Sequence, residues 1–286
     1  MLTPNGVRDW VPDATEEAEW IMSQLKAVFE SGQYRRIKTP SLEYWSVLRP
    51  GLSERMREAA ITFFDADGTL VALRPDHTTP IARIVATQLI HETLPIRLFY
   101  MDSVFRKPRP ERFEDVEILQ AGVELIGAAE SDGDFELIRL CVEGLKALGL
   151  QRFVVDIGHL STMAMVTEAQ KAALLAANYV AFGRLPQTEG EKVVQSVPEI
   201  NALMQNVRRE AWSSHVQFNP GLIKDTQYYT GLVFDVYVEG VGQVVGSGGR
   251  YDGLLAVYGA QRSAVGFALN VNRLGQALRH QKASRP

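Results

Sequence analysis

The hydrophobic and polar positions of the chain follow two periods, one helical and one of alternating strand residues. Residues 14–31 repeat apolar side chains at the helical spacing, which predicts an amphipathic helix packed by one face. Asp13 is expected to cap its start and Gly32 to end it. The predicted buried stripe comprises Ala18, Ile21, Leu25, Val28 and Phe29.

Residues 63–73 are two apolar runs around Asp65–Gly68, which predicts a hairpin because Asp-Ala-Asp-Gly favours a tight turn. Further helices are predicted over 79–93, 132–148 and 270–280. Strands or extended segments are predicted over 34–40, 96–101, 118–126, 152–157, 216–218, 232–238, 243–245 and 265–269. Strands that follow one another with helices inserted between them favour a mostly antiparallel sheet flanked by helices, an α+β fold.

Residues 160–214 differ from the rest because they are mostly helical or irregular, with 169–177 the clearest helix. We interpret them as an insertion within a single domain that covers residues 1–286. The length of 286 residues, with 46% hydrophobic and 22% charged side chains, suits one large globular domain.

Charge and residue counts limit the possible functions. The net charge is −4, whereas proteins that bind nucleic acids mainly through phosphate contacts are usually basic. Transfer RNA is therefore not expected as a partner. The single cysteine, Cys141, rules out an internal disulfide and a cysteine metal cluster, and its apolar surroundings predict a buried thiol. The five histidines form no zinc motif, and neither a metal nor a cofactor is expected.

The chain begins without an apolar leader, and no stretch reaches the roughly 18 apolar residues of a membrane helix. A cytoplasmic protein is therefore expected.

A polar loop after the second strand of the hairpin holds Arg74, Asp76 and Thr78. Asp76 and Thr78 stand at the start of a predicted helix, where a carboxylate and a hydroxyl commonly cap free backbone amides. The same two groups can instead hold the ammonium group of a ligand. The sequence leaves both interpretations open.

Two further polar segments lie between and within the central strands. Residues 105–115 mix basic and acidic side chains with prolines, which fits a phosphate-binding loop or a solvated connection. Gln120, Gly122 and Glu124 share one face of a predicted strand, so that a small polar ligand can rest above the glycine. An ordinary exposed sheet face gives the same pattern.

Aromatic and glycine-rich segments follow near the end of the chain. Residues 228–235 begin with Tyr228 and Tyr229, and residues 246–253 contain several glycines with Arg250 and Tyr251. The glycines do not form a dinucleotide-binding motif, but they allow close approach of a ligand to the backbone. Arg273, in the first turn of the last predicted helix, is on its own an ordinary surface arginine.

Taken in order, these segments resemble histidyl-tRNA synthetase. The most specific matches are Tyr-Tyr-Thr-Gly at 228–231, Gly-Gly-Arg-Tyr-Asp-Gly-Leu at 248–254 and Gly-Phe-Ala at 266–268, supported by 73–76 and 105–106. The resemblance covers most of the chain outside the insertion. It implies a class II aminoacyl-tRNA synthetase core, which usually dimerises.

The resemblance also implies a pocket for histidine. Its residues here are Asp76, Thr78, Gln120, Glu124, Tyr228, Tyr229 and Tyr251. Asp76 stands where the family usually has Glu, which shortens the side chain by one methylene.

The ATP site departs from the family at several positions. Pro108 replaces a glutamate that reads adenine, Glu114 and Val116 replace expected arginines, and Lys224 replaces an arginine of the adenylation step. Lysine keeps the charge but loses the planar fork of the guanidinium group. Arg106 and Arg273 are kept, although Asn270 and Asn272 beside Arg273 differ from the family.

This combination, without the family's C-terminal anticodon-binding domain, resembles the regulatory subunits of bacterial ATP phosphoribosyltransferase. That resemblance implies a non-catalytic protein of histidine biosynthesis that forms a hetero-oligomer with a short catalytic subunit and takes part in activation and histidine feedback. Two alternatives remain: a truncated synthetase-like enzyme that activates histidine or a related amino acid, and an interaction module with another partner.

Overall fold

The computed structural model describes residues 3–108, 115–164, 167–169, 194–195, 197–222, 224 and 228–283. Its centre is an eight-stranded sheet in the order β1-β5-β6-β11-β10-β9-β7-β8. The strands are β1 (Arg35–Arg36), β5 (Ile96–Phe105), β6 (Glu117–Ile126), β7 (Phe153–His159), β8 (Val216–Phe218), β9 (Leu232–Val238), β10 (Gly246–Arg250) and β11 (Ala264–Asn270). Only the two edge pairs, β1 with β5 and β7 with β8, are parallel. The expected mostly antiparallel α+β sheet is confirmed.

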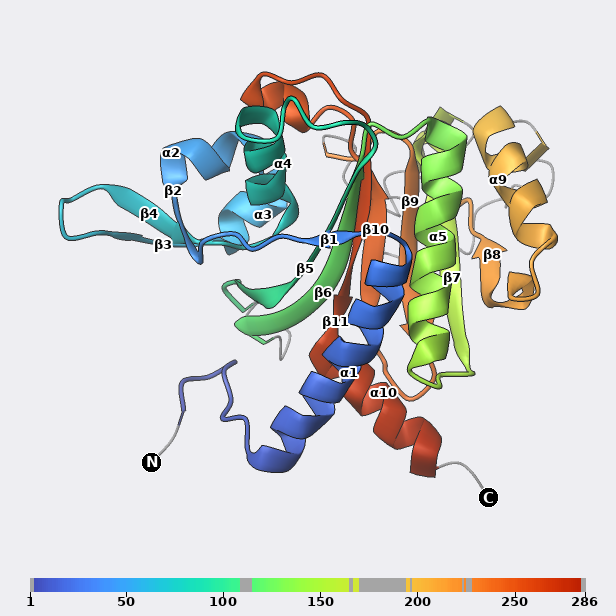
Figure 1. Ribbon diagram of the computed structural model, residues 1–286, viewed down its shortest axis with the longest axis horizontal. Helices are drawn as coiled ribbons and strands as arrows, with labels where there is room; N and C mark the ends of the chain where they lie inside the picture. Colours follow the sequence, from blue (N-terminus) through green and yellow to red (C-terminus); the bar gives the residue numbers. More distant parts are fainter. Residues whose placement is uncertain are drawn as a thin grey trace.

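Helices cover both faces of this sheet and the side beyond β8 (Figure 1). The α-helices are α1 (Pro12–Ser31), α2 (Trp45–Leu48), α3 (Glu54–Ala59), α4 (Thr78–Thr87), α5 (Glu130–Ala147), α9 (Pro198–Arg208) and α10 (Val271–Ala283). Short 3-10 turns are η1 (Arg49–Gly51), η2 (Leu160–Ala164), η3 (Ser213–His215) and η4 (Leu255–Tyr258). In the part of the chain that is described, no helix combines the length and apolar character that a membrane span requires.

Strand alternation divides the interior into two cores on opposite faces of the sheet. On β5, Phe99 belongs to the large core beneath α1 and α5, whereas its neighbours Leu98 and Tyr100 belong to a smaller core beneath α4 and η4. The smaller core lies on the face of β6 that carries Glu124, because Glu124 pairs with Leu98 across the ladder. The candidate site lies on that face of the sheet.

A second sheet of three strands, in the order β2-β4-β3, extends from the body on the side away from α5 and α9 (Figure 1). Its strands are β2 (Leu42–Tyr44), β3 (Ile61–Phe64) and β4 (Leu70–Leu73). The predicted hairpin turn is confirmed: the Asp65 carboxylate accepts hydrogen bonds from the Asp67 amide at 3.0 Å and the Thr69 amide at 2.8 Å.

Some predicted boundaries are wrong. Asp13 is not the cap of α1, because Pro12 already occupies the first turn and Val11 is the capping position. The helix predicted over 79–93 ends at Thr87. Gly32 does end α1, but the left-handed residue after it is Gln33, with φ of 65°.

The strand predicted over 243–245 lies three residues later, in the glycine-rich segment of β10. Glycine disfavours strands in general, but here a Cβ atom at Gly248 would stand 2.5 Å from the Phe234 ring. The tight packing between β9, β10 and β11 therefore requires glycine.

Of the interpreted insertion, the structure describes η2, α9 and η3, which are helical. The predicted helix over 169–177 lies outside the described residues apart from its first residue.

Candidate functional site

The loop between β4 and α4 brings Asp76 and Thr78 to the edge of the sheet face described above. The Asp76 carboxylate accepts hydrogen bonds from the Thr79 amide at 2.7 Å and the Thr79 hydroxyl at 3.2 Å. Asp76 thus binds a backbone amide in the first turn of α4, in line with one of the two interpretations, although the capping position itself is His77. Burial raises the pKa of this carboxyl above its ordinary value, against the hydrogen bonds and the nearby Arg106, which lower it.

Glu124 is the centre of the site. It is 1% exposed. Thr78 donates a hydrogen bond to its Oε1 atom at 2.8 Å, and the Tyr251 hydroxyl donates to its Oε2 atom. Burial raises the pKa of Glu124 to about 8, outweighing the two hydroxyl donors, which lower it. Thr78 and Tyr251 belong to segments 173 residues apart, so only the fold brings them to one carboxyl group.

A glycine on the neighbouring strand makes room for this carboxyl group. Gly266 lies opposite Glu124 in the β6–β11 ladder, and a Cβ atom there would stand 1.9 Å from Oε2 of Glu124. The packing of Glu124 therefore requires the glycine of the Gly-Phe-Ala motif.

Three tyrosine rings form one wall of the site. Tyr228 stacks on Tyr251 with ring centroids 5.7 Å apart and meets Tyr229 edge-on at 4.9 Å. Thr78 also forms a side-chain hydrogen bond with Tyr228. Burial raises the pKa of each of the three phenols, so all three remain neutral hydrogen-bonding groups at neutral pH.

The floor between Glu124 and the far strands is made of small residues. Gly122 pairs with Ala268, and Ala268 pairs with Ser247, so these three lie in one row across β6, β11 and β10. The position directly above Gly122 is nevertheless taken by Tyr100, whose hydroxyl oxygen would stand 2.4 Å from a Cβ atom on that glycine, so these small residues leave no open space there. Gln120 shares the face and is 8% exposed, but it lies about 13 Å along the strand from Glu124, opposite Asn270.

Two aromatic residues beside the site, Tyr100 and His77, are not among those that the sequence indicates. Tyr100 lies opposite Gly122, and a Cβ atom on that glycine would stand 2.4 Å from its hydroxyl oxygen. His77 stacks on Tyr100 with ring centroids 4.3 Å apart. Burial, followed by the charge of Arg74, lowers the pKa of His77 to about 3, so the ring is neutral. The only sequence signal for these two residues is that they lie close to the matching segments 73–76 and 105–106.

Lys224 lies over the same sheet face as Glu124. Its ammonium group is 2.7 Å from the Asp235 carboxylate and donates to the Phe234 carbonyl at 2.6 Å and to the Ser247 hydroxyl. Burial lowers the pKa of Lys224, while Asp235 acts in the opposite direction. The positive charge of Lys224 is thus balanced by the Asp235 carboxylate of β9.

The other positions that the resemblance assigns to an ATP site are placed as follows. Arg106 donates from Nε to the Pro75 carbonyl at 2.7 Å, and Arg273 donates to the Val244 carbonyl at 2.6 Å. Pro108 is exposed, and the Val116 amide donates to the Gly6 carbonyl at 2.6 Å. Glu114 lies outside the described residues.

Comparison with solved structures and protein families defines the class to which this fold and site correspond. The histidyl-tRNA synthetase family matches residues 6–181 and 181–274. The apo histidyl-tRNA synthetase of S. aureus shares the fold, with a TM-score of 0.73 at 22% identity over 99% of this chain and 71% of that one. The fold is therefore that of the class II aminoacyl-tRNA synthetases, as the sequence predicted.

More similar relatives are named ATP phosphoribosyltransferase regulatory subunits. Those of Symbiobacterium thermophilum and Moorella thermoacetica are 33% and 34% identical, over 98% and 96% of this chain and 80% and 81% of theirs. A crystal structure from Bacillus halodurans described as such a regulatory subunit/histidyl-tRNA synthetase has a TM-score of 0.84 and 29% identity, over 97% of this chain and 83% of that one. The chain belongs to this family of regulatory subunits within the histidyl-tRNA synthetase-like proteins.

Proposed function

We propose that the chain is a non-catalytic regulatory subunit of ATP phosphoribosyltransferase, needed for the first step of histidine biosynthesis and involved in its activation and histidine feedback. The observation that carries the non-catalytic part is the pairing of Lys224 with Asp235 at 2.7 Å. Where the synthetases are expected to offer an arginine to the reacting phosphate, this chain has an ammonium group already bound by its own carboxylate.

The other retained cations support the same conclusion. A triphosphate needs positive charge around it, because negative ligands are stabilised by preorganised donors. Arg106 and Arg273 each donate to a backbone carbonyl of the chain itself. Pro108 offers no carboxylate to adenine. Together these features argue against the alternative of a truncated enzyme that activates histidine.

The cluster of polar and aromatic side chains around Glu124 supports a retained histidine-like ligand. Its carboxyl group stands at the end of a floor of small residues, with hydroxyl donors on both oxygens and a wall of tyrosine rings. An ammonium or imidazole group of the ligand is a suitable partner for Glu124, since it offers the positive charge or N–H donors that a buried carboxylate requires. Histidine bound here provides a feedback signal without any chemistry.

The proposed assembly is a hetero-oligomer with the short-form catalytic subunit, in which this chain forms a homodimer in the cytoplasm. The names of the relatives and of the Bacillus halodurans structure support the catalytic partner. The net charge of −4 argues against tRNA as a partner.

Two assays on the purified chain test the proposal. Histidine-dependent exchange between ATP and pyrophosphate is expected to be absent, whereas calorimetry is expected to detect histidine binding. Glu124→Gln should abolish that binding, and Glu19→Gln, a change on the exposed side of α1, should leave it intact. Measurable exchange would contradict the non-catalytic part. Absent binding would remove the histidine pocket and leave the regulatory role to be tested with the catalytic subunit.

A further inference from the structure

The carboxyl group of Glu124 is already engaged by the chain itself. Its Oε1 atom accepts a hydrogen bond from the Thr78 hydroxyl at 2.8 Å, and its Oε2 atom accepts one from the Tyr251 hydroxyl. The side chain is 1% exposed, so neither oxygen is open to solvent in the part of the chain that is described. A ligand that binds Glu124 therefore has to compete with these hydroxyl groups.

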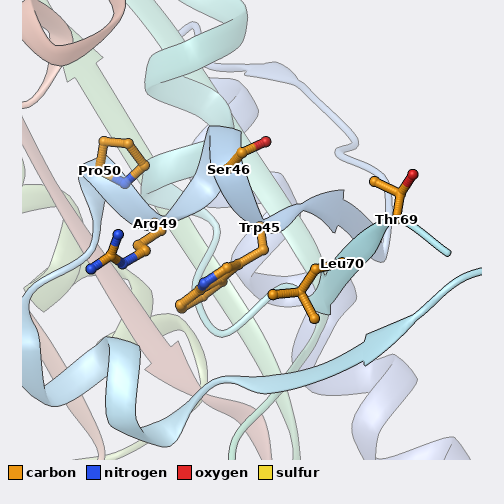
Figure 2. Close-up of a pocket in the computed structure, with 6 residues that line it drawn as sticks. All are labelled: Trp45, Ser46, Arg49, Pro50, Thr69 and Leu70. Carbon is orange, nitrogen blue, oxygen red and sulfur yellow. The ribbon is translucent and has the colours of Figure 1, made fainter.

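The space around this carboxyl group is filled by other parts of the fold. Oε2 lies against Gly266, where a Cβ atom would stand 1.9 Å from it, and the Tyr100 hydroxyl lies over Gly122. An opening of about 450 Å³ is found elsewhere, between α2 and the hairpin of β3 and β4, as Figure 2 shows. Its lining is separate from the Glu124 cluster and comprises Trp45, Ser46, Arg49, Pro50, Thr69 and Leu70. A ligand of Glu124 therefore needs a place that a side chain now occupies.

Tyr251 is the side chain that can yield this place. Thr78 is short and is the first residue of α4, so it has little freedom to move away from Glu124. The ring of Tyr251 can rotate while its backbone stays fixed, because its amide donates to the Ala264 carbonyl at 2.8 Å and its carbonyl accepts from the Leu254 amide at 3.1 Å. Withdrawal of Tyr251 therefore needs a change of side-chain rotamer and no movement of the chain.

Tyr251 presents the same two features as an imidazole ring. Its flat ring stacks on Tyr228, with centroids 5.7 Å apart and an angle of 28° between the planes. Its hydroxyl donates to Glu124 at the same time. An imidazole offers a smaller flat ring and an N–H donor in a similar arrangement. It can therefore stack on Tyr228 and donate to Glu124 in the position that Tyr251 leaves.

We propose that the Tyr251 side chain is an internal substitute for the ligand, and that the imidazole ring of the ligand binds Glu124 by taking its place. The inference rests on the histidine pocket of the proposed function and names the contact that is exchanged there. One hydrogen bond to Oε2 replaces another, and one ring stacked on Tyr228 replaces another. The affinity then depends on the difference between two similar sets of contacts, and the tyrosine hydroxyl lowers it.

The exchange reaches beyond the site through the packing of Tyr251. The smaller core beneath α4 and η4 includes Tyr251 together with Ile81 of α4 and Leu255 of η4. Because protein interiors are close-packed, this core has to rearrange when the tyrosine ring is displaced. Binding at Glu124 is thereby coupled to the packing of α4 and η4, which gives a bound ligand a structural effect on the chain.

The first test is calorimetry of imidazole and histidine binding at about pH 9, where imidazole is neutral and carries an N–H donor. Tyr251→Phe keeps the ring and removes the competing hydroxyl, so its affinity for both ligands should be roughly tenfold higher than that of the wild type. Tyr34→Phe is the matched control, since Tyr34 is another buried tyrosine that donates to a glutamate, Glu136, at 2.9 Å. It should bind both ligands as the wild type does. For each protein 1-methylimidazole, which has no N–H group, should bind at least about tenfold more weakly than imidazole.

A second measurement tests whether the two rings share one place. Tyr251→Ala removes the whole phenol ring and leaves a space beside Tyr228, which free phenol should fill. Saturating imidazole should lower the apparent affinity of this variant for phenol at least about fivefold, because both rings compete for that space. The wild type should bind phenol at least about tenfold more weakly than the variant, since Tyr251 occupies the space. Circular dichroism and thermal unfolding establish that each variant is folded, and Tyr251→Phe carries the test if Tyr251→Ala is not.

The outcomes separate the inference from the proposed function. Unchanged or weaker binding of imidazole and histidine to Tyr251→Phe would show that the Tyr251 hydroxyl does not compete with the ligand, which overturns the inference and leaves the histidine pocket standing. Independent binding of phenol and imidazole to Tyr251→Ala would overturn it in the same way. If neither the wild type nor Tyr251→Phe binds histidine, the histidine pocket falls and the inference falls with it.

Discussion

Lys224 and Asp235 form an ion pair of 2.7 Å in which the side chains are only 13% and 14% exposed. Because both charges are largely removed from water, each stabilises the other, and loss of one partner leaves the second without compensation. The pair also connects the segment before Tyr228 to strand β9. It therefore holds Lys224 within the structural framework of the site.

Removal of the Lys224 charge alone is expected to destabilise the protein. Lys224→Met should lower the free energy of unfolding by about 2–4 kcal/mol, because the Asp235 carboxylate stays buried without its cation. The double variant Lys224→Met/Asp235→Asn should recover a large part of that loss. Urea unfolding of the wild type, both single variants and the double variant measures the coupling. Additive effects would indicate that the pair contributes little.

Gly266→Ala tests the packing around Glu124. The added Cβ atom would stand 1.9 Å from Oε2 of Glu124 and 2.6 Å from the Val123 carbonyl oxygen, so rotation of the glutamate alone cannot relieve the clash. A loss of about 2–3 kcal/mol in unfolding free energy is expected, together with loss of histidine binding. Gly253→Ala is the control, since nothing lies within 4 Å of a Cβ atom there. Equal stability of the two variants would contradict the close packing.

Much of the fold could be predicted because its signals are local. The apolar stripe of α1 and the Asp65 turn depend on neighbouring residues, and both predictions are confirmed. β10 was misplaced because its glycines carry no strand signal. Their presence is explained by neighbours that approach closely in the fold: Leu269 at Gly246, Phe234 at Gly248, and Leu232 and Tyr229 at Gly249.

The site was predictable only in part, because local sequence signals do not reveal contacts between distant segments. The resemblance to synthetases indicated Thr78, Glu124 and Tyr251, and the structure brings these three together. No sequence pattern joins His77 to Tyr100 or Lys224 to Asp235, because each contact arises from the way separate segments cross one sheet face. Gln120 shares that face but lies farther along the strand, a distance that motif order does not reveal.

The elevated pKa of Glu124 predicts how stability changes with pH. The folded protein retains a proton on Glu124 up to about pH 8, whereas the unfolded chain releases it near the ordinary value of 4.5. The unfolded state therefore binds fewer protons between these values, and this group makes the free energy of unfolding fall as the pH rises from about 4.5 to about 8.

Glu124→Gln removes that titration. Between pH 5 and pH 8 the wild type should lose on the order of a few kcal/mol of unfolding free energy more than the variant. Urea unfolding at both pH values measures the difference, with Glu19→Gln as a control that should follow the wild type. Identical pH dependence in wild type and Glu124→Gln would contradict the raised pKa.

Histidine binding should itself depend on pH. A positively charged ligand group favours the ionised form of Glu124, so binding releases a proton below about pH 8. The affinity for histidine should increase by up to about tenfold per pH unit between pH 6.5 and 8. Calorimetry in buffers of different protonation enthalpy detects the released proton. Proton uptake on binding would place another group opposite the ligand.

The measurement that tests the regulatory function most directly combines this chain with the short-form ATP phosphoribosyltransferase of the same organism. The mass of the complex and the rate of phosphoribosyl transfer are measured with and without histidine. A larger complex with a higher rate than the catalytic subunit alone, and a rate that histidine lowers, is the predicted result. A mixture that forms no complex and leaves the rate unchanged would contradict the regulatory function.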